Sequence, residues 1–384
     1  MLQFIPAGVA LAETPAMRYN RQIMDKLQKA LAAHPEVDLA SIVPKDYSNR
    51  LLKRKITKPN SRLAEELHGK SRKLNSKLSL SSAKVLKVED LRDATVDILF
   101  PLSEPVRQIF QDNNDADPTT AENIDKVLGE SAILFRHPVG GTVVLDCKPG
   151  IVVKVTPNSK DLTEYTTLQY LETVHPYIPA PRPSGAAKVG RYCLFFMSRI
   201  DGSTLEEVWP KLNHALKCSV QDHLNSALLK MRPLRRSEDQ QLGGVAGERC
   251  KDLRRHVRVS DHPILTAKEF EDFQFSNPHY GSDEYIRFLR SLSPPLADSC
   301  VFTHGDLRPE NIMVNITEES CILTGIIDWE FSGFYPDYQE AIKVTNSLAP
   351  NERSDWFDYL PDCISPRHHS RRWLLDRLWW KHVE

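Results

Sequence analysis

Apolar positions between residues 132 and 155 fall into three short runs separated by turn residues. The runs are rich in Val, Ile and Leu, and Pro and Gly stand in the intervals between them. Short runs of this kind, bounded by Gly and Pro, are typical of β-strands. The predicted strands are 132–136, 142–146 and 151–155, and the intervals are 138–141 and 147–150. A further apolar run at 192–197 predicts a buried strand that ends in the turn Asp201-Gly202.

Elsewhere apolar residues recur every three to four positions, which predicts amphipathic helices with an apolar core-facing side. In residues 19–33, for example, Ile23, Leu27 and Leu31 share one face. The other predicted helices are 117–131, 164–174, 204–212, 220–234 and 284–294. The Pro-rich segment 178–185 cannot be helical. Residues 237–282 predict a long insertion with local structure.

Residues 301–330 combine this apolar pattern with polar side chains of a particular kind. A polar loop holds His304, Asp306 and Asn311 in an H-x-D-x-x-x-x-N arrangement, and Asp328 follows the next strand. The two strands around the turn are predicted at 312–314 and 321–327. Because a tight turn makes them a hairpin, Asn311 and Asp328 are expected to lie close together. Two carboxylates and an amide oxygen suit a Mg²⁺ ion that carries nucleotide phosphates.

The alternative is that these side chains only cap turns. A polar loop between buried strands is a costly place for three metal-type ligands, which favours a functional site.

Length, composition and charge narrow the class of protein. The 384 residues exceed one ordinary domain and predict two lobes with an extension, and the 41% apolar share suffices for a globular core. A formal net charge of −1 argues against a globally basic nucleic-acid binder. The seven cysteines, without a C-x-x-C pair, indicate reduced thiols inside a cell and not a disulfide framework or zinc site.

The N-terminal stretch differs from the rest. From Lys45 to Lys87 there are 13 Lys or Arg residues against three acidic residues. Such a run is compatible with contact to nucleic acid, an acidic membrane surface or nuclear import, but aromatic residues are not interleaved along it, Tyr47 near its start being the single one. We therefore favour a solvated, largely disordered arm. Residues 1–12 lack a basic residue before their apolar stretch, which argues against a signal peptide, and no stretch approaches the roughly 18 apolar residues of a membrane span. The expected location is the cytoplasm.

Two motifs carry a family resemblance. HGDLRPENIMV (304–314) and IIDWEFSGFYP (326–336) resemble the catalytic loop and metal-binding segment of the aminoglycoside phosphotransferase family, in particular its fungal branch. The tail segments DYQE and APNERSDWFDYLPDC are also similar to that branch. The resemblance implies an α+β, two-lobed protein-kinase-like fold with a small β-rich N-lobe and a mostly helical C-lobe. The implied domains are a mostly disordered extension at 1–95, an N-lobe at 96–197 and a C-lobe at 198–384.

The resemblance also implies an ATP- and Mg²⁺-dependent transfer of the γ-phosphoryl group to a hydroxyl of a small molecule, with no metal other than Mg²⁺. Asp306 would accept or orient the proton of that hydroxyl. Asn311 and Asp328 would hold the Mg²⁺ ion. His304 is expected to brace the loop through hydrogen bonds. Arg308 is left open between contact with phosphate, contact with the acceptor and pairing with a carboxylate.

The nucleotide itself is expected to lie against the N-lobe. In the V-x-K pattern, Lys154 would grip the non-transferred phosphates, paired with Glu164 or Glu172, and the E-x-x-x-L-x-x-L helix of the family favours Glu164. The strand 192–197 would lead into the hinge, where adenine takes backbone hydrogen bonds around Met197 to Arg199. Gly140 and Gly141 would either bring N–H groups to the phosphates or form an ordinary hairpin turn.

Two departures separate this chain from protein kinases, namely HGD in place of HRD and DWE (328–330) in place of DFG. Both favour a small-molecule kinase. A catalytically silent binding module is the competing interpretation, and the joint presence of Lys154, Asp306, Asn311 and Asp328 argues against it. The acceptor is not specified by these motifs.

Overall fold

The computed structural model describes residues 15–44, 47, 94–111, 120–137, 141–157, 160–237, 239–254, 257–297 and 299–383. The chain divides into two compact units, residues 1–81 and 82–384, and each is described by itself.

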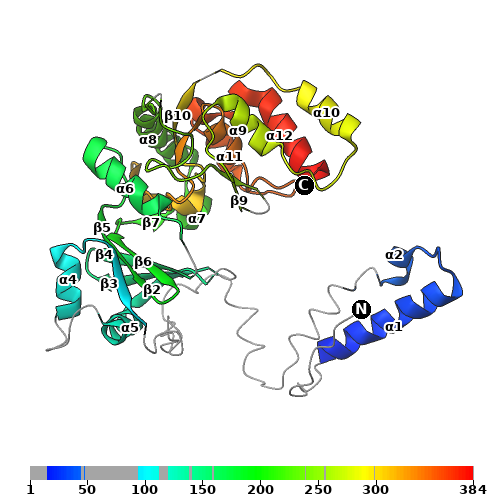
Figure 1. Ribbon diagram of the computed structural model, residues 1–384, viewed down its shortest axis with the longest axis horizontal. Helices are drawn as coiled ribbons and strands as arrows, with labels where there is room; N and C mark the ends of the chain where they lie inside the picture. Colours follow the sequence, from blue (N-terminus) through cyan, green and yellow to red (C-terminus); the bar gives the residue numbers. More distant parts are fainter. Residues whose placement is uncertain are drawn as a thin grey trace. The chain divides into compact units, whose positions relative to one another are not determined.

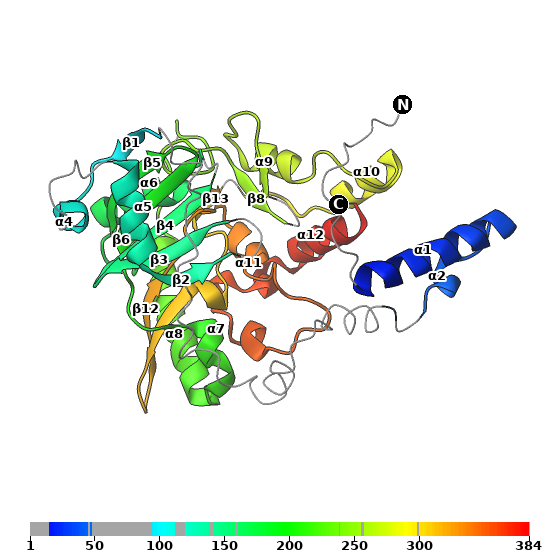
Figure 2. The ribbon, with the colours of Figure 1, turned by 90° about the horizontal axis from the view of Figure 1, so that it is seen from below.

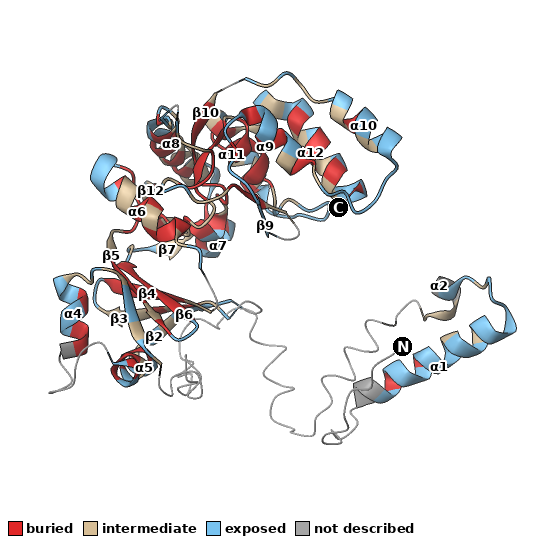
Figure 3. Ribbon diagram, in the orientation of Figure 1, coloured by how far each residue is buried: buried red, intermediate tan, exposed pale blue. Residues whose placement is uncertain are grey.

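The first unit contains the helices α1 (Pro15–Ala33) and α2 (Leu39–Ile42). Tyr19 and Ile23 are buried, whereas most other described positions of α1 are exposed (Figure 3). Tyr19 stacks on Tyr47, with ring centroids 5.7 Å apart. The amphipathic helix predicted at 19–33 is therefore confirmed. The basic stretch 45–87, apart from Tyr47, lies outside the described residues.

The second unit begins with an antiparallel six-stranded sheet of order β1-β5-β6-β4-β3-β2 (Figure 1). Its strands are β1 (Val96–Phe100), β2 (Ala132–Arg136), β3 (Val143–Lys148), β4 (Ile151–Pro157), β5 (Pro183–Val189) and β6 (Tyr192–Ser198). The four strands predicted in this region are confirmed as β2, β3, β4 and β6. β1 was not predicted. β5 was not predicted either, because it starts within the Pro-rich segment 178–185, whose end is extended.

Helices cover both faces of this sheet. They are α4 (Glu104–Gln111), α5 (Ala121–Glu130) and α6 (Thr163–Val174). Side chains alternate between faces along a strand, so Val153 and Val155 of β4 pack with α4 and α5, while Val152 packs with α6. The α6 face also continues into the core of the remaining chain, and α6 lies between the sheet and the helical part (Figure 1). This sheet with its three helices is called the sheet lobe below.

The helical lobe follows β6 and is shown from two sides in Figures 1 and 2. Its helices are α7 (Leu205–Val208), α8 (His214–Met231), α9 (Ala267–Gln274), α10 (Asp283–Ser291), α11 (Gln339–Lys343) and α12 (Ser370–His382). Its short strands are β7 (Ser203–Thr204), β8 (Lys251–Leu253), β9 (Val257–Val259), β10 (Cys300–Thr303), β11 (Ile312–Ile316), β12 (Cys321–Ile326) and β13 (Gly333–Pro336). The two-lobed α+β fold predicted from the sequence is thus confirmed.

Two details of the helical lobe differ from the sequence-based expectation. The helix predicted at 204–212 is only the four-residue α7, followed by a 3₁₀ turn with Pro210 near its start. The helix predicted at 220–234 starts earlier, at His214, because Asn213 caps its N-terminus by accepting a hydrogen bond from the Leu216 amide.

The C-terminal tail of the chain is rich in tryptophan, at positions 356, 373, 379 and 380. Trp356 and Trp379 are buried, and Trp379 packs edge-on against Phe275 with centroids 4.8 Å apart. The tail is therefore part of the core of the helical lobe. All seven cysteines are free thiols. Within the described ranges, no helix combines the length and apolar character that crossing a membrane would require.

Candidate active site

The hairpin predicted around the polar loop is formed by β11 and β12. Ile312 pairs with Ile326, and the Ile327 amide donates to the Asn311 carbonyl at 2.9 Å. Asn311 and Asp328 therefore flank the same end of the hairpin, as predicted. Asp328 has a φ of +66°, a left-handed backbone conformation that non-glycine residues rarely adopt. Such strain is typical of functional sites, where the surroundings hold a side chain in place.

Lys154 points from the sheet lobe towards this hairpin. Its neighbours Val153 and Val155 face α4 and α5, so the alternation of the strand turns Lys154 to the α6 side. Its ammonium Nζ lies 2.7 Å from Glu164 Oε2 and 2.5 Å from Asp328 Oδ1. The expected pairing with Glu164 is confirmed.

Glu172, the other candidate partner, lies two turns further along α6 and is exposed. Glu164, in contrast, is buried in the first turn of α6. The structure therefore settles the choice that the sequence had left to family resemblance.

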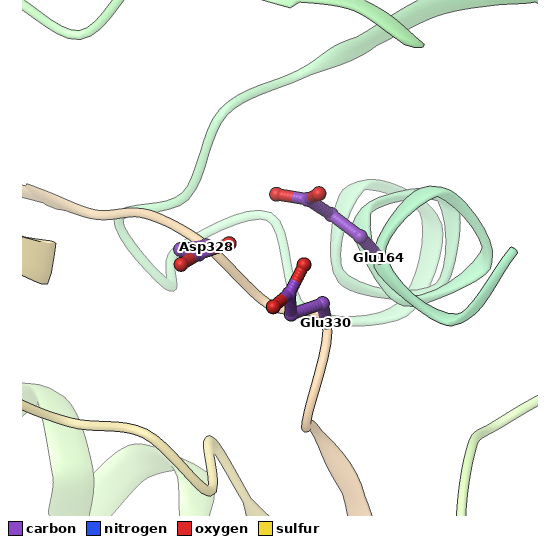
Figure 4. A group of neighbouring side chains, drawn as sticks. All are labelled: Glu164, Asp328 and Glu330. Carbon is purple, nitrogen blue, oxygen red and sulfur yellow. The ribbon is translucent and has the colours of Figure 1, made fainter. Parts of the chain in front are cut away.

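Glu330 is a third partner that sequence reasoning missed. Its Oε2 lies 3.1 Å from Lys154 Nζ. Each of three side chains, Glu164, Asp328 and Glu330, offers one carboxylate oxygen that lies within 4.8 Å of the other two. The three side chains converge in Figure 4. The D-x-E spacing gave no usable signal, because Asp328 has a left-handed backbone conformation and Glu330 lies in a turn, so spacing alone does not fix where the two side chains point.

One ammonium faces three carboxylates in this cluster. Burial opposes the charge on Lys154, but Asp328, Glu164 and Glu330 outweigh it and raise the pKa of Lys154 well above its usual value. Burial, opposed by Lys154 and reinforced by the two other carboxylates, raises the pKa of Glu164 to about 7. Burial also opposes ionisation of Asp328, but the charge of Lys154 and the hydrogen bond that Lys154 donates to Asp328 lower the pKa of Asp328.

These carboxylates fit a divalent cation. Two unit charges of like sign at this spacing repel by about 3 kcal/mol at an effective dielectric constant of about 20, and a cation relieves that repulsion. Hard oxygen donors are the ligands that Mg²⁺ prefers.

Asp306 lies in the loop before β11. The side-chain amide of Asn311 donates to the Asp306 carbonyl at 2.8 Å and to Oδ2 at 3.2 Å, and Arg308 Nε lies 3.3 Å from Oδ2. Burial, opposed by Arg308 and reinforced by Asp328 and Glu330, raises the pKa of Asp306 to about 7. A carboxyl group with this pKa is partly ionised near neutral pH, and its ionised form can accept a proton. Of the options left open for Arg308, pairing with a carboxylate is the one seen.

His304 holds the loop, as predicted. Its Nε2 bonds the Ile327 carbonyl at 3.0 Å, and its Nδ1 accepts from the Asp306 amide at 3.3 Å. These bonds define a neutral ring with the proton on Nε2. Burial, which outweighs the charge of Asp328, lowers the pKa of His304 to about 4. The ring also packs edge-on against Trp329, with centroids 4.6 Å apart.

Glu340 of α11 was not singled out from the sequence. Its buried carboxylate accepts from the His304 amide at 2.5 Å and from the Gly305 amide at 3.3 Å. Burial, opposed by these two backbone donors, raises the pKa of Glu340 to about 7. The loop that contains Asp306 is thus tied to α11, 35 residues later in the chain.

The expected adenine contacts are only partly available. Met197 is buried on the same face of the sheet as Val152 and α6. The Ser198 and Arg199 amides, however, donate within the sheet lobe, to the carbonyls of Arg182 and Gly150 at 2.8 and 2.9 Å. An adenine ring cannot use these two donors without breaking sheet hydrogen bonds. The Arg199 side chain pairs with Asp146.

The glycine pair between β2 and β3 is described in part. Gly141 has a φ of +75°, which suits glycine, and Gly140 lies outside the described residues. Whether these residues reach the phosphates stays a prediction.

Comparisons with known proteins agree with the motifs. The family model described as phosphotransferase enzyme family (APH) matches residues 151–362. No curated protein matches the chain. The matched segment runs from β4 with Lys154 through the hairpin with Asp328 and on to Glu340 of α11, and only the glycine pair Gly140 and Gly141 of the candidates above precedes it.

Several solved structures show a weak overall similarity. An aminoglycoside-3'-phosphotransferase of type VIII is 18% identical, with 66% of this chain and 91% of that chain covered and a TM-score of 0.42. The aminoglycoside phosphotransferase APH(3'')-Id from Streptomyces rimosus is 15% identical, with 67% and 96% covered and a TM-score of 0.40. ADP-bound aminoglycoside phosphotransferase APH(2'')-Ib is 14% identical, with 72% and 86% covered and a TM-score of 0.41.

Proposed function

The chain belongs to the phosphotransferase enzyme family, whose model spans residues 151–362, and we propose that it is a kinase that uses ATP and Mg²⁺ to phosphorylate a hydroxyl group of a small molecule. The observation that supports this most is the convergence of Lys154 and Glu164 from the sheet lobe with Asp328 from the helical lobe. Phosphoryl transfer depends mainly on positioning and on charge around the transferred group.

Each side chain then has a task that its position supports. Lys154 binds the non-transferred phosphates, and Glu164 orients it. Asp306 orients the acceptor hydroxyl and takes its proton, which suits a carboxyl with a pKa of about 7. Met197 offers an apolar contact to the adenine ring, and Arg199 follows directly after the end of the same strand.

Asn311 and Asp328 would hold Mg²⁺, and Glu330 is a further candidate ligand because its carboxylate converges on Asp328. When bound, the ion neutralises phosphate charge that develops during transfer. Asn311 keeps its side-chain N–H group on Asp306, so the amide oxygen is the atom that would face a cation.

A small-molecule acceptor is favoured by the DWE and HGD motifs. Trp329 of DWE is fully buried between His304 and Phe302, and its ring nitrogen donates to the Ile326 carbonyl at 2.8 Å.

A cytoplasmic location is proposed because the seven cysteines are free thiols. Membership of the fungal branch rests on the tail motifs 337–340 and 349–363.

Mg²⁺-dependent nucleotide binding tests this function directly. We expect Mg-ATP to raise the melting temperature of the native protein, and Asp328→Ala to abolish that rise, because a proposed ligand of the Mg²⁺ ion is lost. Lys217→Met is a matched control, since Lys217 pairs with Asp355 away from the site. If Mg-ATP stabilises neither the native protein nor the control, the proposed function is wrong. Turnover of ATP with a panel of hydroxylated small molecules then identifies the acceptor, and phosphorylation of proteins alone would favour a protein kinase.

A further inference from the structure

The segment 240–254, part of the predicted insertion, lies against the candidate active site. Gly243 and Phe334 exchange two backbone hydrogen bonds, of 3.0 and 2.8 Å, which attach the segment to β13. A side chain at Gly333 would overlap the Gly243 carbonyl, so the approach is close. Glu248 Oε1 accepts from Thr166 Oγ1 of α6 at 2.6 Å. The segment therefore touches both α6 and the chain that follows the DWE motif.

Lys251 of β8 sits at the centre of this junction and is 7% exposed. Its ammonium donates to Thr163 Oγ1 at 2.9 Å and to the Glu330 carbonyl at 2.5 Å, and it pairs with Asp161. Asp161 in turn accepts from the Thr163 amide at 3.1 Å at the first residue of α6. Lys251 thus ties the N-terminus of α6 to the DWE segment.

Neighbouring contacts hold Lys251 in place. Its amide donates to Tyr335 Oη at 3.0 Å. The next residue, Asp252, is fully buried and pairs with Lys343 of α11 at 2.6 Å and with Arg254 at 2.8 Å. β8 is therefore anchored in the helical lobe, so the backbone that carries the Lys251 side chain is held in place.

Two lysines from different segments join the same two elements. Lys154 joins the side chains of Glu164 and Glu330, whereas Lys251 joins Thr163, the residue before Glu164, to the backbone of Glu330. The two lysines differ in their partners. When a nucleotide binds, phosphate would compete for the Lys154 ammonium and Mg²⁺ would compete for the carboxylates that Lys154 pairs with. The contacts of Lys251 face no such competition.

We propose that Lys251 is a positioning residue that keeps α6 aligned with the DWE segment while Lys154 engages the nucleotide. This inference rests on the proposed function, because it concerns the state in which Lys154 turns from carboxylates to phosphates. In that state the link through Lys154 weakens, and the link through Lys251 holds Glu164 within reach of Lys154.

The test compares Lys251→Met, Lys251→Arg and the control Lys217→Met in the full chain. We expect the Kd for Mg-ADP to rise about tenfold in Lys251→Met, the size of a typical coupling between linked sites. Lys251→Arg should recover most of this loss because it keeps the charge. Lys217→Met, which removes another lysine–aspartate ion pair away from the site, should leave the Kd unchanged.

Amide hydrogen exchange of α6 separates positioning from a general loss of stability. In the native protein, addition of Mg-ADP should slow exchange in residues 163–174. In Lys251→Met it should accelerate exchange, because this variant lacks the link through Lys251 and Mg-ADP weakens the link through Lys154. If α6 of Lys251→Met responds to Mg-ADP as the native protein does, the inference is wrong and the proposed function stands. If the native protein does not bind Mg-ADP, both fail.

Asp161→Asn covers the case in which Lys251→Met does not fold. This change keeps the oxygen that caps α6 and removes the charge that Lys251 pairs with. We expect the same direction of change in Kd and in exchange, and native-like values for both would overturn the inference.

Discussion

At the scale of single residues, burial decides the chemistry of the candidate site. Asp306 and His304 lie two positions apart, and both are largely removed from water. Burial disfavours the charged form of each, so it raises the pKa of the acid and lowers the pKa of the base. The result is a proton acceptor that titrates near neutral pH beside a histidine that stays neutral.

The pH dependence of catalysis follows from Asp306. A carboxyl with a pKa of about 7 is protonated below that pH, so the base form is lost as pH falls. We expect kcat/KM to rise with pH and to level off above about 7. Arg308→Leu should move this midpoint to higher pH, because Arg308 lowers the pKa of Asp306. A midpoint near pH 4 in the native enzyme would contradict the assignment.

Asp306→Asn tests the same residue without changing pH. We expect kcat to fall by about 10² to 10⁴-fold, the usual contribution of a positioned base, with nucleotide affinity retained. Initial rates and a binding isotherm for Mg-ADP provide the two measurements. A variant with native kcat would exclude Asp306 as the base.

At the scale of elements, contacts between distant segments hold the catalytic loop and α6 in place. The loop at 304–306 is bound by the Glu340 carboxylate of α11. α6 is bound to the DWE segment by Lys154 and Lys251, and by the pair Thr167 Oγ1 and Ser332 Oγ at 2.7 Å. The geometry of the site is therefore a property of several elements together.

Glu340→Gln tests how far α11 holds the catalytic loop. Glutamine keeps the shape, but its amide nitrogen cannot accept a hydrogen bond, so at least one of the three hydrogen bonds that the carboxylate accepts from the His304 and Gly305 amides is lost. We expect a loss of about 1–3 kcal/mol in the free energy of unfolding, measured by urea denaturation. An unchanged unfolding free energy would show that water replaces the lost acceptor.

At the scale of the whole molecule, the family match and the candidate site fall in one unit. Residues 151–362 and every side chain of the site belong to the unit 82–384. The basic stretch 45–87 lies almost entirely before it. The core that packs the sheet lobe on the helical lobe is built from residues of this unit alone.

Deletion of residues 1–81 is expected to leave folding and Mg-ATP stabilisation intact, because no residue of the site or of its supporting contacts is removed. Melting curves with and without Mg-ATP check this. If the truncated protein folds but no longer gains stability with Mg-ATP, the N-terminal unit contributes to nucleotide binding.

The sequence alone determined a large part of the elements and the residue types of the site. Its apolar periodicity located strands β2, β3, β4 and β6 and most long helices, and the hairpin rule placed Asn311 beside Asp328. These inferences succeed because they depend on neighbours in the chain, where spacing fixes direction.

Only the tertiary structure decided which distant side chains meet. It chose Glu164 over Glu172, added Glu330 and Glu340, and placed Lys251 from an insertion against α6. It also showed the Ser198 and Arg199 amides to be used within the sheet lobe. Such contacts join residues up to 176 positions apart, and no local spacing encodes them. Burial follows from the same packing, which is why the pKa shifts that suit the hairpin to phosphoryl transfer could not be predicted from its sequence.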